Sequence, residues 1–178
     1  LERGKSLGLD GIQFGRLRSF QEEKLRAIRK KADELGMYLE LGLGGPSPTF
    51  SLPESNFEKC VEAASTMEIK AVRTFLKWPP RMFEGLRSLD EVRSFLKKAK
   101  KELVEIERLG RRRKVKIGIE NHMDFTADEF RDLMKDVGSE YLGICLDTGN
   151  CLWTAEDQVE VAEKLAPYTN IIHLKDFR

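Results

Sequence analysis

The sequence lacks the features that direct a protein to a membrane or to nucleic acid. No apolar run among its 178 residues approaches the roughly 20 that a membrane-spanning helix needs. Neither charge dominates, because 31 Lys and Arg face 30 Asp and Glu. No net field would therefore draw the chain to a polyanion or to a lipid surface. We expect neither nucleic acid nor a membrane as its partner.

Cysteine is scarce as well. Cys60, Cys145 and Cys151 do not form the paired framework that small secreted domains use. Cys145 lies inside an apolar run, which favours a reduced thiol and hence a cytoplasmic protein. Cys151 has no base near it in the sequence, so we interpret it as a small packing residue and not as a nucleophile.

What the sequence does contain is a regular alternation of short apolar runs and longer amphipathic segments. With 40% hydrophobic residues the chain can bury one sizeable core. The alternation is typical of strand-helix units and a parallel sheet. Strands are expected at 11–14, 37–43, 70–76, 115–120, 141–147 and 171–176. Helices are expected at 21–35, 55–67, 88–110, just after Thr126, and near 155–165.

Cap residues mark several of these boundaries. Gly36 is positioned to end the first helix, since glycine is the usual residue just past a helix C-terminus. Ser55 with Glu58, and Thr126 with Glu129, have the spacing of capping boxes.

Six strand-helix units fit either an open doubly wound sheet or most of an eightfold barrel. A dinucleotide-binding doubly wound sheet needs a G-x-G-x-x-G turn, and residues 41–45 (LGLGG) lack its third glycine and a following helix start. Polar residues instead gather just past the strands, where barrel enzymes carry their chemistry. These residues are Arg73, Glu120, Asn121, His122, Asp147, Asn150, His173 and Lys175. We therefore predict an α/β fold of the (β/α)8 TIM-barrel type.

Glu120, Asp147 and His173 end three successive strands, each about one strand-helix-strand repeat from the next. Equivalent ends of neighbouring parallel strands lie close together, so these side chains are expected to converge. Two carboxylates and an imidazole are ligands for a divalent metal ion. Either carboxylate alone would more simply be explained as a helix cap or an ion-pair partner. Together with the imidazole at matched spacing, they favour metal binding.

The segments GIENHMDFT, LDTGN and HLKD resemble, in their order and spacing, the xylose-isomerase-like TIM-barrel superfamily, especially its sugar phosphate isomerase/epimerase branch. The resemblance implies one divalent metal ion (Mn²⁺, Co²⁺, Zn²⁺ or Mg²⁺) held by Glu120, Asp147, His173 and a Glu on strand eight. In its register this chain holds strands two to seven. We therefore expect a single domain over 1–178 that is truncated at both ends and lacks strands one and eight, and with them the fourth ligand.

The same resemblance implies a divalent-metal-dependent isomerase or epimerase acting on a keto sugar or a related small polyhydroxy carbonyl compound. The reaction would be proton transfer through a metal-stabilised enediolate, with Glu120 as both metal ligand and acid/base. Arg73 and Lys175 are expected to hold a phosphate or carboxylate of the substrate. Trp78 and Trp153 are expected to form an apolar wall that excludes water.

Three further residues at this end of the barrel are interpreted less specifically. His122 is a candidate for substrate binding, and a hydrogen bond within its loop explains it equally well. Asn150 is a second candidate for substrate binding. Asn121 and Asn150 are both expected to orient ligands or loops through hydrogen bonds.

Other functions use the same scaffold. A metal-dependent dehydratase of a cyclitol or a dehydroshikimate-like acid shares these ligands, and the sequence does not separate a lyase from an isomerase. A barrel-derived binding protein without turnover is a further alternative. An endonuclease IV-type enzyme is disfavoured, because its three-zinc cluster needs several histidines and this chain has two. Asn150 also stands where that family has a histidine. A small sugar or keto acid is thus the expected partner, and the oligomeric state is not predicted.

Overall fold

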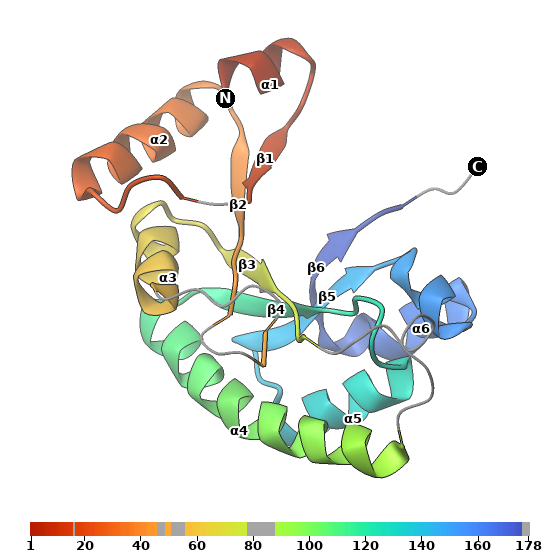
Figure 1. The fold of residues 1–178 in the computed structure, drawn as a ribbon. Coiled ribbons are helices and arrows are strands. Elements are labelled where there is room, and N and C mark those ends of the chain that lie inside the picture. The colour runs from red at the N-terminus through yellow and green to blue at the C-terminus, as the bar shows by residue number, and fades with distance from the viewer. Residues whose placement is uncertain (16, 46–48, 51–55, 78–87, 176–178) are drawn as a thin grey trace.

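The computed structural model describes residues 1–15, 17–45, 49–50, 56–77 and 88–175, and it contains six strands interleaved with helices (Figure 1). The strands are β1 (Gly11–Phe14), β2 (Tyr38–Gly42), β3 (Ala71–Thr74), β4 (Lys116–Glu120), β5 (Leu142–Asp147) and β6 (Thr169–His173). The helices are α1 (Glu2–Ser6), α2 (Glu22–Glu34), α3 (Phe57–Thr66), α4 (Leu89–Arg113), α5 (Ala127–Val137) and α6 (Gln158–Leu165). Two short 3-10 helices, η1 (Asn150–Thr154) and η2 (Ala166–Tyr168), flank α6.

The strands form one parallel sheet in which each strand pairs with the next in the chain, in the order β1-β2-β3-β4-β5-β6. A doubly wound sheet would reverse its strand order at a switch point. No such reversal occurs among the described strands. The barrel-type prediction is therefore confirmed.

The sheet is strongly curled. In a flat sheet, three strand spacings of about 4.8 Å would separate β3 from β6 by roughly 14 Å. Cα atoms of β3 and β6 nevertheless approach within 8 Å of one another, and those of β4 and β6 do so too. Figure 1 shows α3, α4, α5 and α6 on the outer, convex side of this curl. The six strands thus form an incomplete barrel with the carboxyl ends of the strands at one rim.

The core lies between the outer face of the sheet and the helices. Leu41, Ile117 and Ile144 are fully buried there, and α4 contributes Leu103 and Ile106 to the same cluster. Burying one Leu or Ile side chain contributes about 1.5–3 kcal/mol. Because successive side chains of a strand point to opposite faces, the alternate residues of the strands face the concave side. The sequence of each strand therefore supplies core residues and site residues in turn.

Two of the predicted helix boundaries are confirmed by their cap geometry. Thr126 and Glu129 exchange both hydrogen bonds of a capping box at the start of α5. Gly36 follows α2 in the left-handed conformation, with φ of 61°, which costs glycine little. These caps fix where β2 and α5 begin relative to their neighbours.

Other boundaries differ from the sequence prediction. Ser55 lies outside the described residues, and the N-cap residue of α3 is Asn56, so the predicted cap is wrong by one position. Helix α4 continues past Gly110 to Arg113 and ends at Lys114 in the left-handed conformation. Residues 150–154 form η1, so α6 begins at Gln158 and not near 155. The last strand spans 169–173, two residues earlier than expected at its start.

The described helices include none that is long and apolar enough to span a membrane. Cys60, Cys145 and Cys151 are buried free thiols, as their lack of pairing in the sequence predicted. Burial raises the pKa of the Cys145 thiol, and it also raises that of Cys151. A raised pKa keeps both thiols protonated and poorly nucleophilic at neutral pH.

Candidate metal centre

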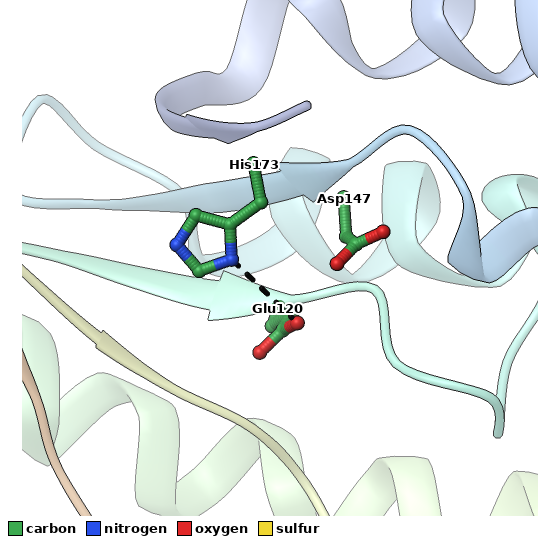
Figure 2. A group of neighbouring side chains, drawn as sticks. All are labelled: Glu120, Asp147 and His173. Carbon is green, nitrogen blue, oxygen red and sulfur yellow. Dashed lines mark ion pairs between the residues drawn. The ribbon is translucent and has the colours of Figure 1, made fainter. Parts of the chain in front are cut away.

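Three side chains from three adjacent strand ends converge at the rim of the curled sheet. Glu120 is the last residue of β4, Asp147 the last of β5 and His173 the last of β6, and Asp147 and His173 are register partners. Each offers a ligand atom that lies within 4.8 Å of the other two. Figure 2 shows the imidazole of His173 and the carboxylates of Glu120 and Asp147 turned toward a common point. The structure thus brings together the three residues that the strand spacing selected.

Glu120 is buried at 5% exposure beneath basic and polar neighbours. Its Oε2 lies 2.8 Å from Nη1 of Arg73, and Oε1 lies 3.8 Å from Nδ1 of His173. The amide of Asn150 donates to Oε1 at 3.3 Å. Burial alone would raise the pKa of Glu120, but His173, Arg73 and His122 outweigh it, and the pKa lies below its ordinary value. The carboxyl group is therefore ionised at neutral pH, as a metal ligand must be.

Asp147 presents one oxygen to the backbone and the other to the site. The backbone N–H groups of Gly149 and Asn150 donate to Oδ1 at 3.0 and 3.1 Å. Asn121 fixes the Asp147 backbone through two further hydrogen bonds, one at its carbonyl oxygen and one at its N–H. The second oxygen, Oδ2, lies 2.8 Å from Nζ of Lys175. The turn that follows β5 therefore holds this carboxylate in one orientation.

His173 is oriented from its other ring nitrogen. Nε2 lies 3.2 Å from the side-chain nitrogen of Gln13 on β1, which also donates to Glu40 on β2 at 3.1 Å. The ring is about one-quarter exposed. A partner at Nε2 leaves Nδ1 as the nitrogen that faces Glu120. Because the Gln13 nitrogen is a donor, this contact fixes the orientation of the ring but differs from the acceptor that usually supports a metal-ligating histidine.

The residues present fit a divalent ion. Within the described part of the chain, Glu120 Oε2 and Asp147 Oδ2 are buried side-chain oxygens that accept no hydrogen bond, and each has only a cationic neighbour. Buried carboxylate oxygens without hydrogen bonds are costly unless a cation compensates them. Two carboxylates and an imidazole suit Mg²⁺, Mn²⁺, Co²⁺ and Zn²⁺ alike. The donor set therefore supports a single ion without selecting which one.

His122 joins the site through an aromatic stack. Its ring stacks on Phe75 with centroids 4.6 Å apart, and the guanidinium of Arg73 lies 5.6 Å from the centroid of the same phenylalanine. Burial lowers the pKa of His122; Glu120 opposes this effect, while Lys175 and Arg73 reinforce it. The imidazole is thus neutral at physiological pH, able to donate from one nitrogen and accept at the other.

The other residues expected at the site divide into two groups. Asn150 and Lys175 reach it directly, because Asn150 donates to Oε1 of Glu120 and Nζ of Lys175 lies 2.8 Å from Oδ2 of Asp147. Nζ of Lys175 also donates to Oδ1 of Asn150 at 2.7 Å. Trp153 lies on η1 and is 36% exposed, and its part in an apolar wall stays a prediction. Trp78 lies outside the described residues.

The sequence analysis did not predict the roles of Gln13 on β1 and Glu40 on β2. Gln13 contacts His173, and Glu40 accepts a hydrogen bond from Gln13. A charged Glu40 within the apolar run YLELG was the available signal, because a strand buried on both faces has little room for a carboxylate. The role of Phe75 as a platform for His122 carried no such signal. The stack forms because the segments that follow β3 and β4 lie side by side.

The chain as a whole matches one protein family. The sequence profile of the Xylose isomerase-like TIM barrel family matches residues 1–178. The chain belongs to this family. The resemblance drawn from GIENHMDFT, LDTGN and HLKD is thereby confirmed for this xylose isomerase-like TIM barrel.

Among curated proteins, the chain is similar to the 3-oxo-isoapionate decarboxylase of Pectobacterium atrosepticum, at 26% identity over 167 residues. The alignment covers 92% of this chain and 54% of the decarboxylase, so the chain spans about half the length of that relative.

Solved structures show the same fold. A D-psicose 3-epimerase crystallised in the presence of D-fructose superposes with a TM-score of 0.78 at 20% identity, over 97% of this chain and 65% of the epimerase. A xylose isomerase-like TIM barrel protein from Mycobacterium smegmatis in complex with magnesium superposes with a TM-score of 0.67 at 18% identity, over 97% of this chain and 64% of that protein. At these identities the likeness establishes the fold alone.

Proposed function

We propose that this xylose isomerase-like TIM barrel is a divalent-metal-dependent isomerase or epimerase of a keto sugar or a related small polyhydroxy carbonyl compound. The observation that carries the proposal is the convergence of Glu120, Asp147 and His173, whose ligand atoms lie within 4.8 Å of one another. Three protein ligands leave coordination positions open for water or substrate, as catalytic sites do. When bound, a divalent ion supplies a Lewis acid that polarises a carbonyl and acidifies the neighbouring C–H.

Glu120 is the proposed acid/base. Its carboxylate is ionised at neutral pH and buried at the end of β4, so it is ready to accept a proton from a carbon beside the carbonyl. Arg73 keeps Oε2 of Glu120 occupied at 2.8 Å, and Asn150 donates to Oε1. These two partners fix the direction in which the carboxylate faces the substrate.

Substrate hydroxyl groups would meet polar side chains that surround this carboxylate. His122 is neutral and can both donate and accept a hydrogen bond. Asn150 offers an amide, while Arg73 and Lys175 offer positive charge toward an acidic group of the substrate. Trp78 and Trp153, which follow strands in the sequence, are proposed to form an apolar wall that excludes water.

The names of the similar proteins support carbonyl chemistry of this class. D-psicose 3-epimerase is named for inverting a carbon, and 3-oxo-isoapionate decarboxylase for removing a carboxyl group from an oxo acid. Both reactions place negative charge on a carbon next to a carbonyl. The similarity to the decarboxylase supports a lyase acting on a keto acid as a second candidate function.

Hydrogen exchange tests the proposal. The chain is loaded with Mn²⁺, Co²⁺, Zn²⁺ or Mg²⁺ and incubated in deuterium oxide with a panel of ketoses and keto acids. We expect metal-dependent incorporation of deuterium beside the carbonyl of at least one compound, and its loss in Glu120→Gln. Glu105→Gln, at an exposed ion pair on α4, is the control and retains exchange. A metal-loaded chain that exchanges none of the compounds and decarboxylates no keto acid contradicts the proposal.

We also propose that residues 1–178 act within a single barrel domain in the cytoplasm. The three buried free thiols support a reducing compartment.

A further inference from the structure

Asp147 has one oxygen available for a metal ion, and Lys175 already occupies it. Oδ1 is engaged by the backbone N–H groups of Gly149 and Asn150 at 3.0 and 3.1 Å. Oδ2 accepts no hydrogen bond among the described residues, and its neighbour is Nζ of Lys175 at 2.8 Å. An ion that ligates Asp147 through Oδ2 therefore competes with this ammonium group.

The side chain of Lys175 can move away from Asp147 without a change in the backbone. Its backbone N–H donates to Oγ1 of Thr148 at 3.0 Å, and the N–H of Thr148 donates to the carbonyl of His173, so the chain here is anchored. The side chain, in contrast, is 44% exposed, whereas that of Asp147 is 1% exposed. A lysine on a flexible four-carbon stem can change rotamer and move its ammonium group off Asp147 while staying at the rim of the site, at the cost of its 2.7 Å hydrogen bond to Oδ1 of Asn150.

The charges of the site change sign when an ion enters. Without metal, Arg73 and Lys175 neutralise Glu120 and Asp147, and Glu40, which contacts Gln13, leaves one negative charge in excess. A divalent ion adds two positive charges, so that the site then carries one positive charge in excess. A surplus of positive charge in a partly buried site favours an anionic ligand.

We infer that Lys175 is an internal counterion that holds the metal position at Asp147, and that a metal ion displaces it to create a binding site for an anionic group of the substrate. The group is a carboxylate or a phosphate. The inference rests on the proposed function, which it extends by naming the substrate class and an order of binding. Metal binds first, and the anion binds after it.

Metal affinity is the first test. Mn²⁺ is titrated calorimetrically at low ionic strength into the wild-type chain, Lys175→Met and Lys100→Met. Lys100 is the matched control, because its Nζ also lies 2.8 Å from a carboxylate, Asp136, and its side chain is also 44% exposed. Removing a competing cation should tighten Mn²⁺ binding by about fivefold in Lys175→Met, the size expected for a partly exposed ion pair. Lys100→Met should bind Mn²⁺ as the wild type does.

Anion affinity is the second test, with sorbitol, gluconate and sorbitol 6-phosphate as matched probes. The Mn²⁺-loaded wild type should bind gluconate or sorbitol 6-phosphate about tenfold or more tightly than sorbitol. The preferred one identifies the anion as carboxylate or phosphate. Lys175→Met should lose this preference, and the metal-free wild type should lack it. Lys175→Arg should restore part of it.

The two readouts move in opposite directions for Lys175→Met, which loss of folding would not produce. Unchanged Mn²⁺ and anion affinities in a Lys175→Met chain that binds Mn²⁺ overturn this inference and leave the proposed function intact. Failure of every variant, wild type included, to bind Mn²⁺ or another divalent ion overturns both.

Discussion

Asn121 and Asp147 hold each other through two hydrogen bonds across the ends of β4 and β5. Nδ2 of Asn121 donates to the carbonyl oxygen of Asp147 at 3.0 Å, and the N–H of Asp147 donates to Oδ1 of Asn121 at 2.7 Å. Both residues are buried, at 5% and 1% exposure. A side chain thus continues the backbone pairing of the sheet beyond Glu120. The link fixes the distance between two of the three proposed metal ligands.

Asn121→Ala should therefore lower the unfolding free energy of the chain, and it should also leave Asp147 less firmly placed at the candidate metal centre. Two buried backbone groups of Asp147 lose their partners, which costs about 2–4 kcal/mol of unfolding free energy. Urea unfolding measures this loss. Asn170→Ala is the control, because the Asn170 side chain donates one long hydrogen bond, 3.4 Å to the carbonyl of Ile117. An Asn121→Ala chain as stable as Asn170→Ala would contradict this role.

Gln13 is expected to act on metal binding without touching the metal. Its side chain lies 3.2 Å from Nε2 of His173 and is itself held by Glu40. Substitution of such a supporting residue typically weakens metal affinity by about tenfold or more. Gln13→Met should show this loss in a calorimetric titration with Mn²⁺. Gln21→Met, at the start of α2 outside the site, should bind as the wild type does, and equal affinities for the two variants would refute the assignment.

The stability of the metal-free chain should fall as the pH drops through the range where histidine titrates. Burial lowers the pKa of His122 below 6.5, so the unfolded chain takes up a proton that the folded chain does not. The contribution is complete above pH 6.5 and is lost as the pH falls toward the lowered pKa. His122→Phe keeps an aromatic ring on Phe75 and removes the side chain that takes up this proton. Between about pH 7.5 and about pH 5.5, its unfolding free energy should fall less than that of the wild type. An equal fall in the unfolding free energies of His122→Phe and the wild type would contradict a lowered pKa of His122.

The convergence of the three proposed metal ligands was predictable because parallel strands impose a simple geometry. Residues at equivalent strand ends must meet, so Glu120, Asp147 and His173 follow from the strand assignments alone. The supporting contacts were not predictable in this way. Gln13 reaches His173 across 160 positions because the sheet curls, and the amount of curl is a property of the packed structure.

Helix boundaries failed where packing overrode a local signal. Gly110 resembled a helix end, yet α4 runs through it to Arg113. A Cβ at position 110 would lie 2.8 Å from the carbonyl of Val115 and 3.3 Å from that of Tyr141. The glycine is there because the backbone of the neighbouring segments approaches the helix closely.

Gly110→Ala should consequently destabilise the chain although alanine is the better helix former. Backbone atoms cannot move aside as a flexible side chain can, so the substitution should cost about 1–3 kcal/mol of unfolding free energy. Gly4→Ala on α1 is the control, since its nearest contact would be the flexible end of Met37 at 3.4 Å. Urea unfolding distinguishes them. A Gly110→Ala chain at least as stable as the wild type would show that the helix shifts freely.

Metal stoichiometry under native conditions measures the central claim most directly. Native mass spectrometry and calorimetry with Mn²⁺, Co²⁺, Zn²⁺ and Mg²⁺ should show one divalent ion per wild-type chain. Asp147→Asn and His173→Ala should each weaken its binding by at least about tenfold. Asp136→Asn, at an exposed ion pair on α5, should leave it unchanged. A folded wild-type chain that binds none of these ions, or binds them equally well without Asp147 and His173, contradicts the account.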